Sequence, residues 1–554
     1  MHTRSPKTDH SAIRRHLLAF GLTAFIFIFS YALFGIRYYT NDDATLANIA
    51  AGAYGDSIHM IYVNVLFAFL LRPLHLLAPA LNWYVLVQIA LMFAAAVLLI
   101  DLALDKLGTA KGTLLTAIIA LPFSSILLQR FQYVHTSGFL LCAGLILIAV
   151  TLGRPNARTV CGILLALAGS MLRWPNFLAM GGLSAALLLG YFFRLDRADK
   201  KKAVATMLVL FVLIFGAKGF DSWYYQQDPD WKYFTEYNDA RTAFSDYAVY
   251  HIEGDTNEFC AEGIFSPLES TMMMRWDYYD PAVYTPEKVQ AAAASIPHRP
   301  LTYAVKETVK TGISLLYGTY YHWLVAGLAL YALFCVKFNK KALPLWGTIG
   351  MFGLMLFYLK YLNRFPSYVE APLLLALILY SICCLHLADH RNPVRIEFVA
   401  GFLAFLVIQY PAVCHTLRAE AKIKKESIAT EEIYFQAMNE DKDHLYLLST
   451  EAITVCAGLD VTNPRPENFY SNVVHYGGWL SGAPTCKEAM AQYGVTRPIV
   501  DAVDNPNVYL GYHGIDYAVA YASEQLGCPV EAVDCGPNAF APYQLRRVTE
   551  TPAS

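Results

Sequence analysis

The sequence predicts a polytopic α-helical membrane protein with about eleven membrane-spanning helices, a cytoplasmic N-terminus and a C-terminal extracytoplasmic α/β domain. Apolar residues make up 56% of the 554 residues and charged residues only 16%, a balance outside the range of soluble domains. The apolar residues gather into runs close to the length that crosses a hydrocarbon core, roughly 20 residues. Lys and Arg gather in alternate connections between these runs, as the positive-inside rule requires.

Eleven apolar segments are the candidate spans. Six are runs of about spanning length without a charged residue, and these are residues 16–36, 82–100, 112–129, 131–152, 342–359 and 371–387. Five others are shorter or less clean, namely residues 159–172, 176–193, 203–217, 321–336 and 396–414. The first run follows the basic residues Arg4, Lys7, Arg14 and Arg15 and is longer than the core of a signal peptide. We therefore expect an uncleaved signal anchor.

Residues 59–80 decide the orientation of the later loops. They are interrupted by Arg72, Pro73, His75 and Pro79, and an apolar helix of such limited length lies in the interface more often than it spans. If they do not cross, the inward connections hold the basic residues Lys106, Lys111, Arg154, Arg158, Arg194, Arg197, Lys200, Lys201, Lys202, Lys337, Lys340, Lys341, Arg391 and Arg395. If they did cross, these clusters would face outward, against the positive-inside rule.

This orientation divides the chain into two parts. Residues 1–414 form the transmembrane module, whose first outer loop, residues 37–81, contains the interfacial helix. A second outer loop, residues 221–318, is long enough to expect a function. It contains two proline-bounded segments with helical character, residues 286–300 and 301–316.

Residues 415–554 are the predicted α/β domain. Strands are expected at residues 444–450 and 507–512, and helices that stop at glycine at residues 486–494 and 516–527. The domain has no phosphate-binding glycine loop, metal-spaced Cys/His cluster or nucleophile elbow. We therefore assign it substrate docking or a structural role.

Cysteines of the outward parts are able to form disulfides. Cys528 with Cys535 is the favoured bridge and Cys456 with Cys486 the second, although spacing does not fix the pairing.

Asp42 and Asp43 directly follow the first span. Two adjacent carboxylates repel each other unless a metal, a cation or a raised pKa compensates. Such a pair suits a general base or a cation site. The alternative is that Asn41, Asp42 or Asp43 caps the helix that begins at ATLANIA.

A second set of residues places positive charge on the short outward connections, where Lys and Arg are normally rare. These are Arg130 with His135, Arg173, and Lys360 with Arg364. At headgroup depth their donors suit a lipid phosphate or pyrophosphate. Snorkelling to the interface or pairing with carboxylates is the alternative.

The long loop adds EYNDARTAFSDYAVYH, in which Asn238, Arg241 and Asp246 either share a helical face or flank its ends. Surface salt bridging is the alternative to a substrate contact. The surrounding Tyr and Trp residues suit either sugar stacking or an interfacial aromatic belt.

These features together resemble the GT-C superfamily of polytopic glycosyltransferases, which includes oligosaccharyltransferases, protein O-mannosyltransferases and lipid A aminoarabinose transferases. The likeness rests on the cytoplasmic N-terminus, the acidic pair after the first span, the interfacial helix and the outer C-terminal domain. NDDATLANIAAGAYGD, YNDAR, NRFP and GGWLSGAP are similar to segments of a group of bacterial membrane proteins of this type.

The resemblance implies an inverting enzyme that transfers a sugar from a polyprenyl-phosphate-type donor to a glycan, lipid or protein acceptor at the outer face of the cell membrane. Asp42 would be the general base and Asp43 its support, and the arginines would stabilise the leaving phosphate. A divalent cation at Asp42 and Asp43 is left open, and this sequence has Asp-Asp where several members have Asp-Glu. The alternatives are a lipid-linked glycan polymerase or ligase, or a transporter or flippase; no nucleic-acid partner is expected.

Overall fold

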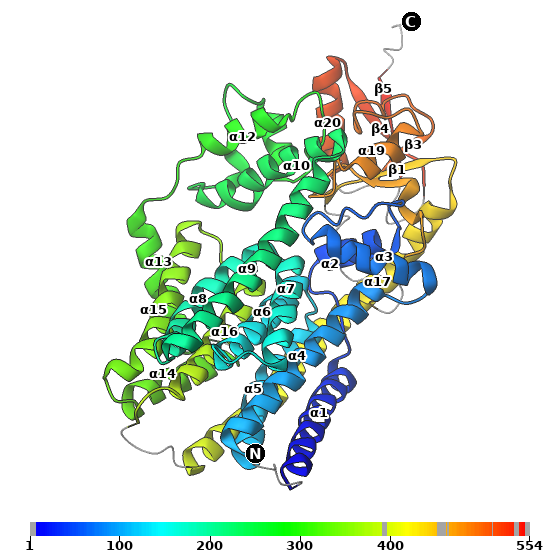
Figure 1. Cartoon of the computed structure of the whole chain (residues 1–554). Coiled ribbons are helices and arrows are strands. Elements are labelled where there is room, and N and C mark those ends of the chain that lie inside the picture. Colours follow the sequence, from blue (N-terminus) through cyan, green and yellow to red (C-terminus); the bar gives the residue numbers. More distant parts are fainter. Residues whose placement is uncertain are drawn as a thin grey trace, which may run out of the picture.

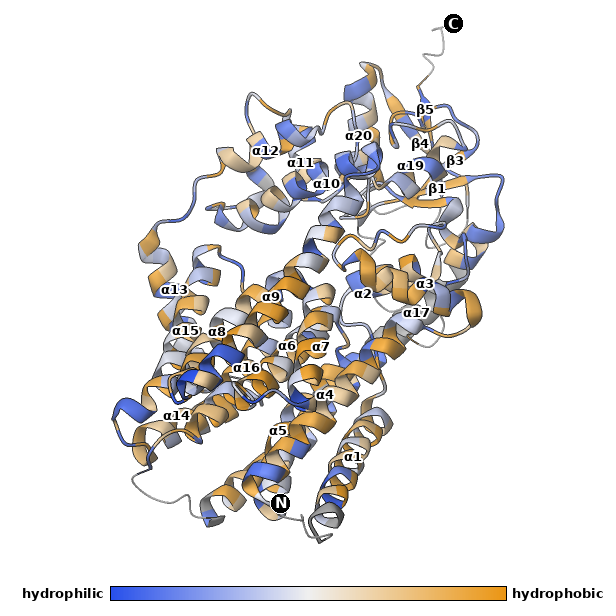
Figure 2. Cartoon of the chain, viewed as in Figure 1, coloured by the Kyte–Doolittle hydropathy of each residue, from blue (hydrophilic) through white to orange (hydrophobic). Residues whose placement is uncertain are grey.

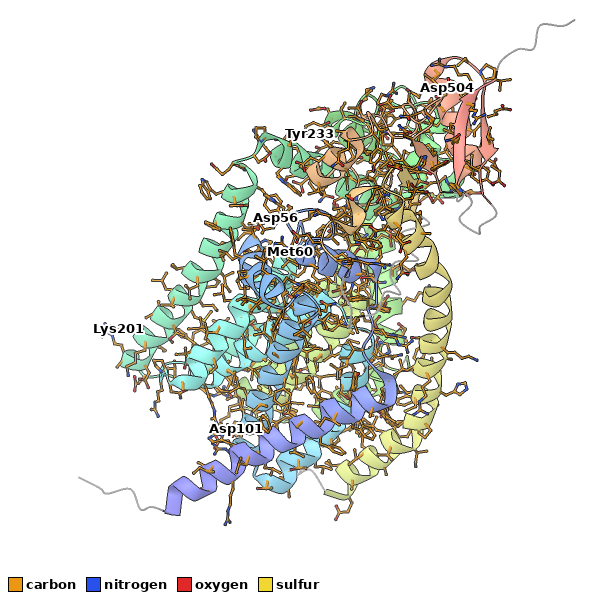
Figure 3. The ribbon with its side chains drawn as sticks, turned by 90° about the vertical axis from the view of Figure 1, so that its right-hand side faces the viewer. Asp56, Met60, Asp101, Lys201, Tyr233 and Asp504 are labelled. Atoms are coloured by element: carbon orange, nitrogen blue, oxygen red, sulfur yellow. The ribbon has the colours of Figure 1, made fainter. Side chains whose placement is uncertain are left out.

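The computed structural model describes residues 7–318, 320–390, 396–450, 461, 465–511, 514–536 and 542–548. Long helices form a bundle at the end that holds the N-terminus, and short helices with a sheet form a cap at the opposite end (Figure 1). Apolar residues dominate the bundle, whereas polar residues are more frequent in the cap (Figure 2). Figure 3 places Asp101 and Lys201 toward the N-terminal end and Tyr233 and Asp504 in the cap. This arrangement is compatible with a helical membrane protein.

The bundle contains α1 (Lys7–Phe34), α4 (Trp83–Leu107), α5 (Thr109–Gln129), α6 (Tyr133–Val150), α7 (Ala157–Leu172), α8 (Trp174–Phe192), α9 (Arg197–Tyr225), α14 (His322–Cys335), α15 (Leu343–Tyr361), α16 (Ser367–Leu385) and the first half of α17 (Ile396–Glu440). Among the described residues, nine helices are long and apolar enough to cross a membrane, and each coincides with a predicted segment. The other two predicted segments form the shorter helices α7 and α14. Because these two measure only about 21 to 24 Å at 1.5 Å per residue, the total of eleven spans stays a prediction.

Helix α6 is the centre of the bundle, and it is buried from Tyr133 to Ala149 among α4, α7, α8 and α16. Glycines allow α7 to approach it closely. A Cβ atom on Gly144 would lie 2.5 Å from the carbonyl oxygen of Gly162, and one on Gly162 would lie 2.8 Å from the carbonyl oxygen of Gly144. Small residues at such crossings are typical of packed membrane helices. This packing fixes the α7–α8 turn, which carries Arg173.

The first outer loop forms α2 (Asn41–Ala51) and α3 (Val65–Leu77), both in the cap. Helix α3 has 13 residues and is therefore about 20 Å long, short of a ~30 Å hydrocarbon core. Its Leu70 and Leu77 are 53% and 82% exposed. An uncovered apolar face on a short helix fits the predicted interfacial role, which stays a prediction.

The long loop is mostly helical. It contains α10 (Pro229–Arg241), the π-helix η1 (Thr242–Tyr247), the 3₁₀ helices η2 (Ala248–His251) and η3 (Thr256–Glu258), α11 (Pro267–Met274), α12 (Pro286–Ser295) and α13 (Leu301–Ser314). The helices predicted within residues 286–300 and 301–316 are confirmed as α12 and α13. A π-helix is rare and occurs frequently at functional sites, and here it directly follows Arg241.

The C-terminal part contains a five-stranded mixed sheet in the order β2-β1-β3-β5-β4. Its strands are β1 (Leu445–Leu448), β2 (Val473–His475), β3 (Val508–Leu510), β4 (Val530–Asp534) and β5 (Tyr543–Arg547), and its helices are α19 (Pro484–Ala491) and α20 (Ile515–Leu526). Strand β1 is parallel to β2 and β3, whereas β5 is antiparallel to β3 and β4. The two predicted strands are confirmed as β1 and β3, and the two predicted helices as α19 and α20.

The sheet docks on the first outer loop. The backbone amide of Asn468 donates to the carbonyl of Gly52 at 2.9 Å, and that of Tyr470 donates to the carbonyl of Ala53 at 2.8 Å. The rings of Tyr54 and Tyr470 stack at 4.4 Å. Helix α17 runs from the bundle into the cap, so the predicted domain boundary at residue 415 falls inside a continuous helix. The two predicted parts therefore meet over α2, next to Asp42.

The favoured disulfide is absent, since Cys528 and Cys535 are both free. The extended strand β4 lies between them, and at about 3.3 Å per residue it holds their Cα atoms far beyond the ~7 Å limit for a disulfide. Cys486 is free and buried, while Cys456 lies outside the described residues, as do Arg391 and Arg395 of the predicted inward loop.

Candidate functional site

A cavity of about 410 Å³ lies where the bundle meets the cap. Its polar wall comes from segments far apart in the sequence: the start of α2, the α7–α8 turn, the end of α10 with η1, the α15–α16 turn and the sheet domain. Together with the α2–α3 connection and the residues that follow α11, these segments contribute Asn41, Asp42, Tyr62, Arg173, Arg241, Thr242, Asp246, Trp276, Arg364, Thr450, Gly478 and Trp479. Five of the predicted site residues thus line one cavity: Asp42, Arg173, Arg241, Asp246 and Arg364.

The opposite wall of the cavity is apolar. It is formed by α8, α15 and α16, which contribute Ala179, Met180, Met355, Leu359, Val369 and Leu373. Helices α8, α15 and α16 are among those apolar enough to cross a membrane. The cavity is therefore amphipathic, with charged groups on the cap side and hydrocarbon on the bundle side, as a lipid with a polar headgroup requires.

Asp42 lies in the first turn of α2 and accepts a 2.9 Å hydrogen bond from the indole Nε1–H of Trp479. The N-cap residue is Thr40, without a side-chain capping bond, so the alternative that Asn41, Asp42 or Asp43 caps this helix is wrong. Burial raises the pKa of Asp42, and the nearby charge of Arg173 and the Trp479 hydrogen bond offset part of that rise. A carboxylate with a raised pKa facing a cavity is suited to accept a proton.

Asp43 is buried and absent from the cavity lining. Its Oδ1 accepts 2.9 Å and 2.8 Å hydrogen bonds from the Tyr84 hydroxyl and the Tyr133 amide, which tie α2 to α4 and α6. Burial raises the pKa of Asp43 well above its ordinary value. Within the part of the chain that the structure describes, no three His, Cys, Asp or Glu residues converge as a metal site. The acidic pair therefore divides into one carboxyl in the cavity and one that anchors the helix.

Arg173 projects its guanidinium over the rings of Tyr62 and Tyr133, at 5.2 and 5.8 Å. No ion-pair partner is found for it among the described residues. The residue takes an extended conformation between α7 and α8, which aims the side chain into the cavity. Burial raises the pKa of Asp42, and the positive charge of Arg173 lowers it and so offsets part of that rise. Arg173 is therefore a permanent charge available to an anionic ligand.

Arg241 is only 1% exposed, which excludes the alternative of a surface salt bridge. Its Nε–H donates to Asn238 at 2.9 Å, and its Nη2 donates to the Tyr62 hydroxyl at 3.0 Å and approaches Asp246 at 3.5 Å. Its Nη1 is buried without a hydrogen-bond partner. A buried donor left unpaired is costly, and here it belongs to a side chain that lines the cavity.

Asp246 also pairs with Arg364, whose Nη2 lies 3.0 Å from Asp246 Oδ1. Arg364 Nη1 donates to the Asp246 carbonyl at 2.6 Å. Asp246 therefore holds two arginines side by side, and the predicted grouping of Asn238, Arg241 and Asp246 is a set of direct contacts in which Asn238 positions Arg241 from outside the cavity lining.

The structure does not bring Arg130, His135 or Lys360 into this cavity. Arg130 pairs with Glu420 of α17 at 2.7 Å. His135 is buried and stacks on Tyr39 at 5.9 Å, and Lys360 lies over the ring of Phe365 at 5.1 Å. Their expected phosphate contacts are thus not supported by their positions.

Backbone strain is concentrated around the cavity. Among the non-glycine residues with positive φ are Ile61 (62°), Trp276 (68°) and Asn363 (49°). Trp276 lines the cavity, and the other two directly precede Tyr62 and Arg364, which also line it. Non-glycine residues in this region cost energy and cluster at functional sites. This strain is independent support for the site.

The sequence reasoning missed Trp479, Trp276, Tyr62 and Thr450. A signal for Trp479 was present in its glycine-rich surroundings, YGGWLSG. A Cβ on Gly477 would lie 2.5 Å from both Asp277 Oδ1 and the Trp276 carbonyl oxygen. Only glycine lets this loop lie against the long outer loop and extend Trp479 toward Asp42.

We expect Gly477→Ala to destabilise the protein by about 1–3 kcal/mol, because the added methyl group overpacks this contact. The midpoint of thermal unfolding in detergent measures the effect. Gly350→Ala is the control, because a Cβ there meets no neighbour within 4 Å, and it should leave the midpoint unchanged. Gly494 is unsuitable as a control because its positive φ strains any added side chain. Equal midpoints for Gly477→Ala and Gly350→Ala would contradict the close approach.

Comparison of the chain with protein-family models, curated proteins and solved structures finds no match. The functional argument therefore rests on the geometry and chemistry of the cavity.

Proposed function

We propose that this protein is a membrane glycosyltransferase that moves a sugar from a polyprenyl-phosphate-type donor to an acceptor at the outer face of the cell membrane. The observation that carries the proposal is the single amphipathic cavity that holds Asp42, three arginines and an apolar wall. The arginines suit the phosphate, the apolar wall suits the polyprenyl chain, and the carboxylate suits the acceptor hydroxyl. The N-terminal end of the bundle then faces the cytoplasm and the cap faces outward.

The residues divide the reaction between them. The Asp42 carboxylate accepts the proton of the acceptor hydroxyl, whose oxygen forms a bond to the anomeric carbon from the face opposite the phosphate. The bond from that carbon to the phosphate oxygen breaks, its electron pair leaves with the phosphate, and the configuration inverts. Arg173, Arg241 and Arg364 stabilise the charge that grows on the leaving phosphate. Donors fixed before the reaction are most effective in a site that excludes water.

The direct test uses the purified protein in proteoliposomes that contain a radiolabelled sugar linked to a polyprenyl phosphate. Covalent transfer of label to an added acceptor, with release of the polyprenyl phosphate, is the expected result. Movement of the intact lipid across the bilayer without a covalent product would instead indicate a transporter or flippase. Extension or transfer of a preassembled lipid-linked glycan that survives loss of Asp42 would indicate a polymerase or ligase.

Trp479 should act as a positioning residue for Asp42. Trp479→Phe keeps an aromatic ring but removes the N–H donor, and hydrogen bonds to charged groups contribute about 1.5–3 kcal/mol. Because that bond favours the ionised form of Asp42, its loss raises the pKa of Asp42. The rate falls as pH drops through this pKa, so the acid limb of the pH–rate profile should move to higher pH, with turnover about tenfold lower.

The pH–rate profile distinguishes positioning from a purely structural role for Trp479. Trp323→Phe, at a tryptophan outside the cavity lining, serves as the control. An acid limb that stays in place in Trp479→Phe would contradict the positioning role, whatever the change in rate.

A further inference from the structure

A second cavity, of about 210 Å³, lies inside the bundle and shares no lining residue with the first. It is bounded chiefly by α4, α5, α6 and α16. Along α4 its lining extends from Met92 to Leu107, about 23 Å at 1.5 Å per residue. Along α5 it extends from Leu115 to Leu128, about 20 Å. The cavity is therefore elongated along the axes of α4 and α5.

The lining of this cavity offers almost no hydrogen-bonding group to a polar ligand. Its walls are almost entirely aliphatic and aromatic, and the Thr116 hydroxyl donates to the carbonyl of Gly112 in its own helix. Ser124, near the end toward the cap, bonds to Ser30 of α1 at 3.0 Å. The cavity is partly open rather than fully enclosed, and apolar cavities do not hold water. In a bilayer, the material available to fill it is hydrocarbon.

The end away from the cap is different. Lys106 and His386 line it and are exposed. The adjacent carboxylate, Asp105, is already paired with Arg15 at 2.6 Å and with Arg158 at 2.9 Å. Lys106 itself has no ion-pair partner among the described residues. An uncompensated cation thus lies at the mouth of an apolar tube.

We infer that this cavity binds one acyl chain of an anionic membrane phospholipid, whose headgroup phosphate pairs with Lys106. The aliphatic lining and the length along α4 and α5 match a single extended chain. The charge at the mouth selects an acidic headgroup over a zwitterionic one. Helix α5 packs against α1, α4 and α17, whereas α16 packs against α6, α8, α14 and α15. A chain between α5 and α16 would join these two groups of helices.

The experiment uses full-length protein in nanodiscs and phosphatidylglycerol that carries a photoreactive diazirine in one acyl chain. After irradiation, peptide mapping should locate the crosslinks on the cavity-lining faces of α4, α5 and α16. Ala103→Trp fills the cavity and should abolish these crosslinks. Ala94→Trp, on the same helix but outside the lining, should retain them. Equal labelling of both variants would overturn the inference.

Headgroup selection is tested without altering the cavity. Competition by unlabelled phosphatidylglycerol should exceed that by phosphatidylcholine, and Lys106→Glu should reduce this preference by at least about fivefold, since one basic residue near a membrane contributes about that factor. Lys111→Glu, an exposed lysine of α5 outside the lining, should preserve it. A preference unaffected by Lys106→Glu, or crosslinks spread over all lipid-facing surfaces, would show only the ordinary lipid contact of a membrane protein.

Discussion

Asp42→Asn is expected to lower the rate of sugar transfer by about 10³-fold, within the 10²–10⁴ range of general-base catalysis. Asparagine keeps the shape of the side chain and, through its amide oxygen, the hydrogen bond from Trp479. It has no basic oxygen to take the acceptor proton. Binding of the donor should change little, because the phosphate contacts arise from other residues. Initial rates in the proteoliposome assay, together with donor-binding measurements, check both parts.

Asp43→Asn is the matched control for this loss. Asp43 is adjacent in the sequence, yet it points to Tyr84 and Tyr133 and is absent from the cavity lining. Its raised pKa favours the protonated form, which asparagine resembles, so transfer should fall less than tenfold. Full activity of the Asp42→Asn, Asp43→Asn double variant would exclude the general-base mechanism. It would direct attention to a polymerase or ligase that relies on the arginines.

The site residues that could be predicted from the sequence are those that lie at the ends of predicted membrane spans. The length of an apolar run sets the depth of the residue that follows it, and the alternation of basic loops sets its face. Depth and face together are enough to predict Asp42, Arg173 and Arg364 as site residues. The position of a residue around the bundle axis cannot be predicted in this way, because it depends on which helices pack together. Arg130 is predicted at the same depth and face, but it pairs with Glu420 because α5 packs against α17.

Contacts across the chain explain the remaining misses. Trp479 reaches Asp42 over a sequence separation of 437 residues, through a sheet that docks on the first outer loop. No local pattern encodes such a contact, although the glycines around Trp479 permit it. Strand β2 contains only Val473–His475, too short to show the alternation that identifies a strand. From the sequence, the C-terminal domain is expected only to dock substrate or to support the structure. That expectation does not include Trp479, which this domain contributes to the cavity.

Arg173→Ala is expected to lower kcat/KM for sugar transfer by about 10²–10³-fold. This loss is comparable to that caused by removing one preorganised hydrogen-bond donor to a developing anion. The other two arginines of the cavity are both in contact with Asp246, which neutralises part of their charge before substrate binds. Arg173 lies over the rings of Tyr62 and Tyr133 instead. It therefore contributes the least compensated charge to the phosphate.

The division of this effect between kcat and KM shows when Arg173 acts. If the guanidinium meets charge that grows as the sugar–phosphate bond breaks, kcat should fall more than KM rises. Arg173→Lys should recover only part of the loss, because an ammonium group keeps the charge but lacks the planar fork that binds two phosphate oxygens. Arg130→Ala removes an arginine that pairs with Glu420 outside the cavity and should leave kcat within a few-fold of the parent. Equal losses in Arg173→Ala and Arg130→Ala would mean that the cavity does not hold the leaving phosphate, since Arg173 lines it and Arg130 does not.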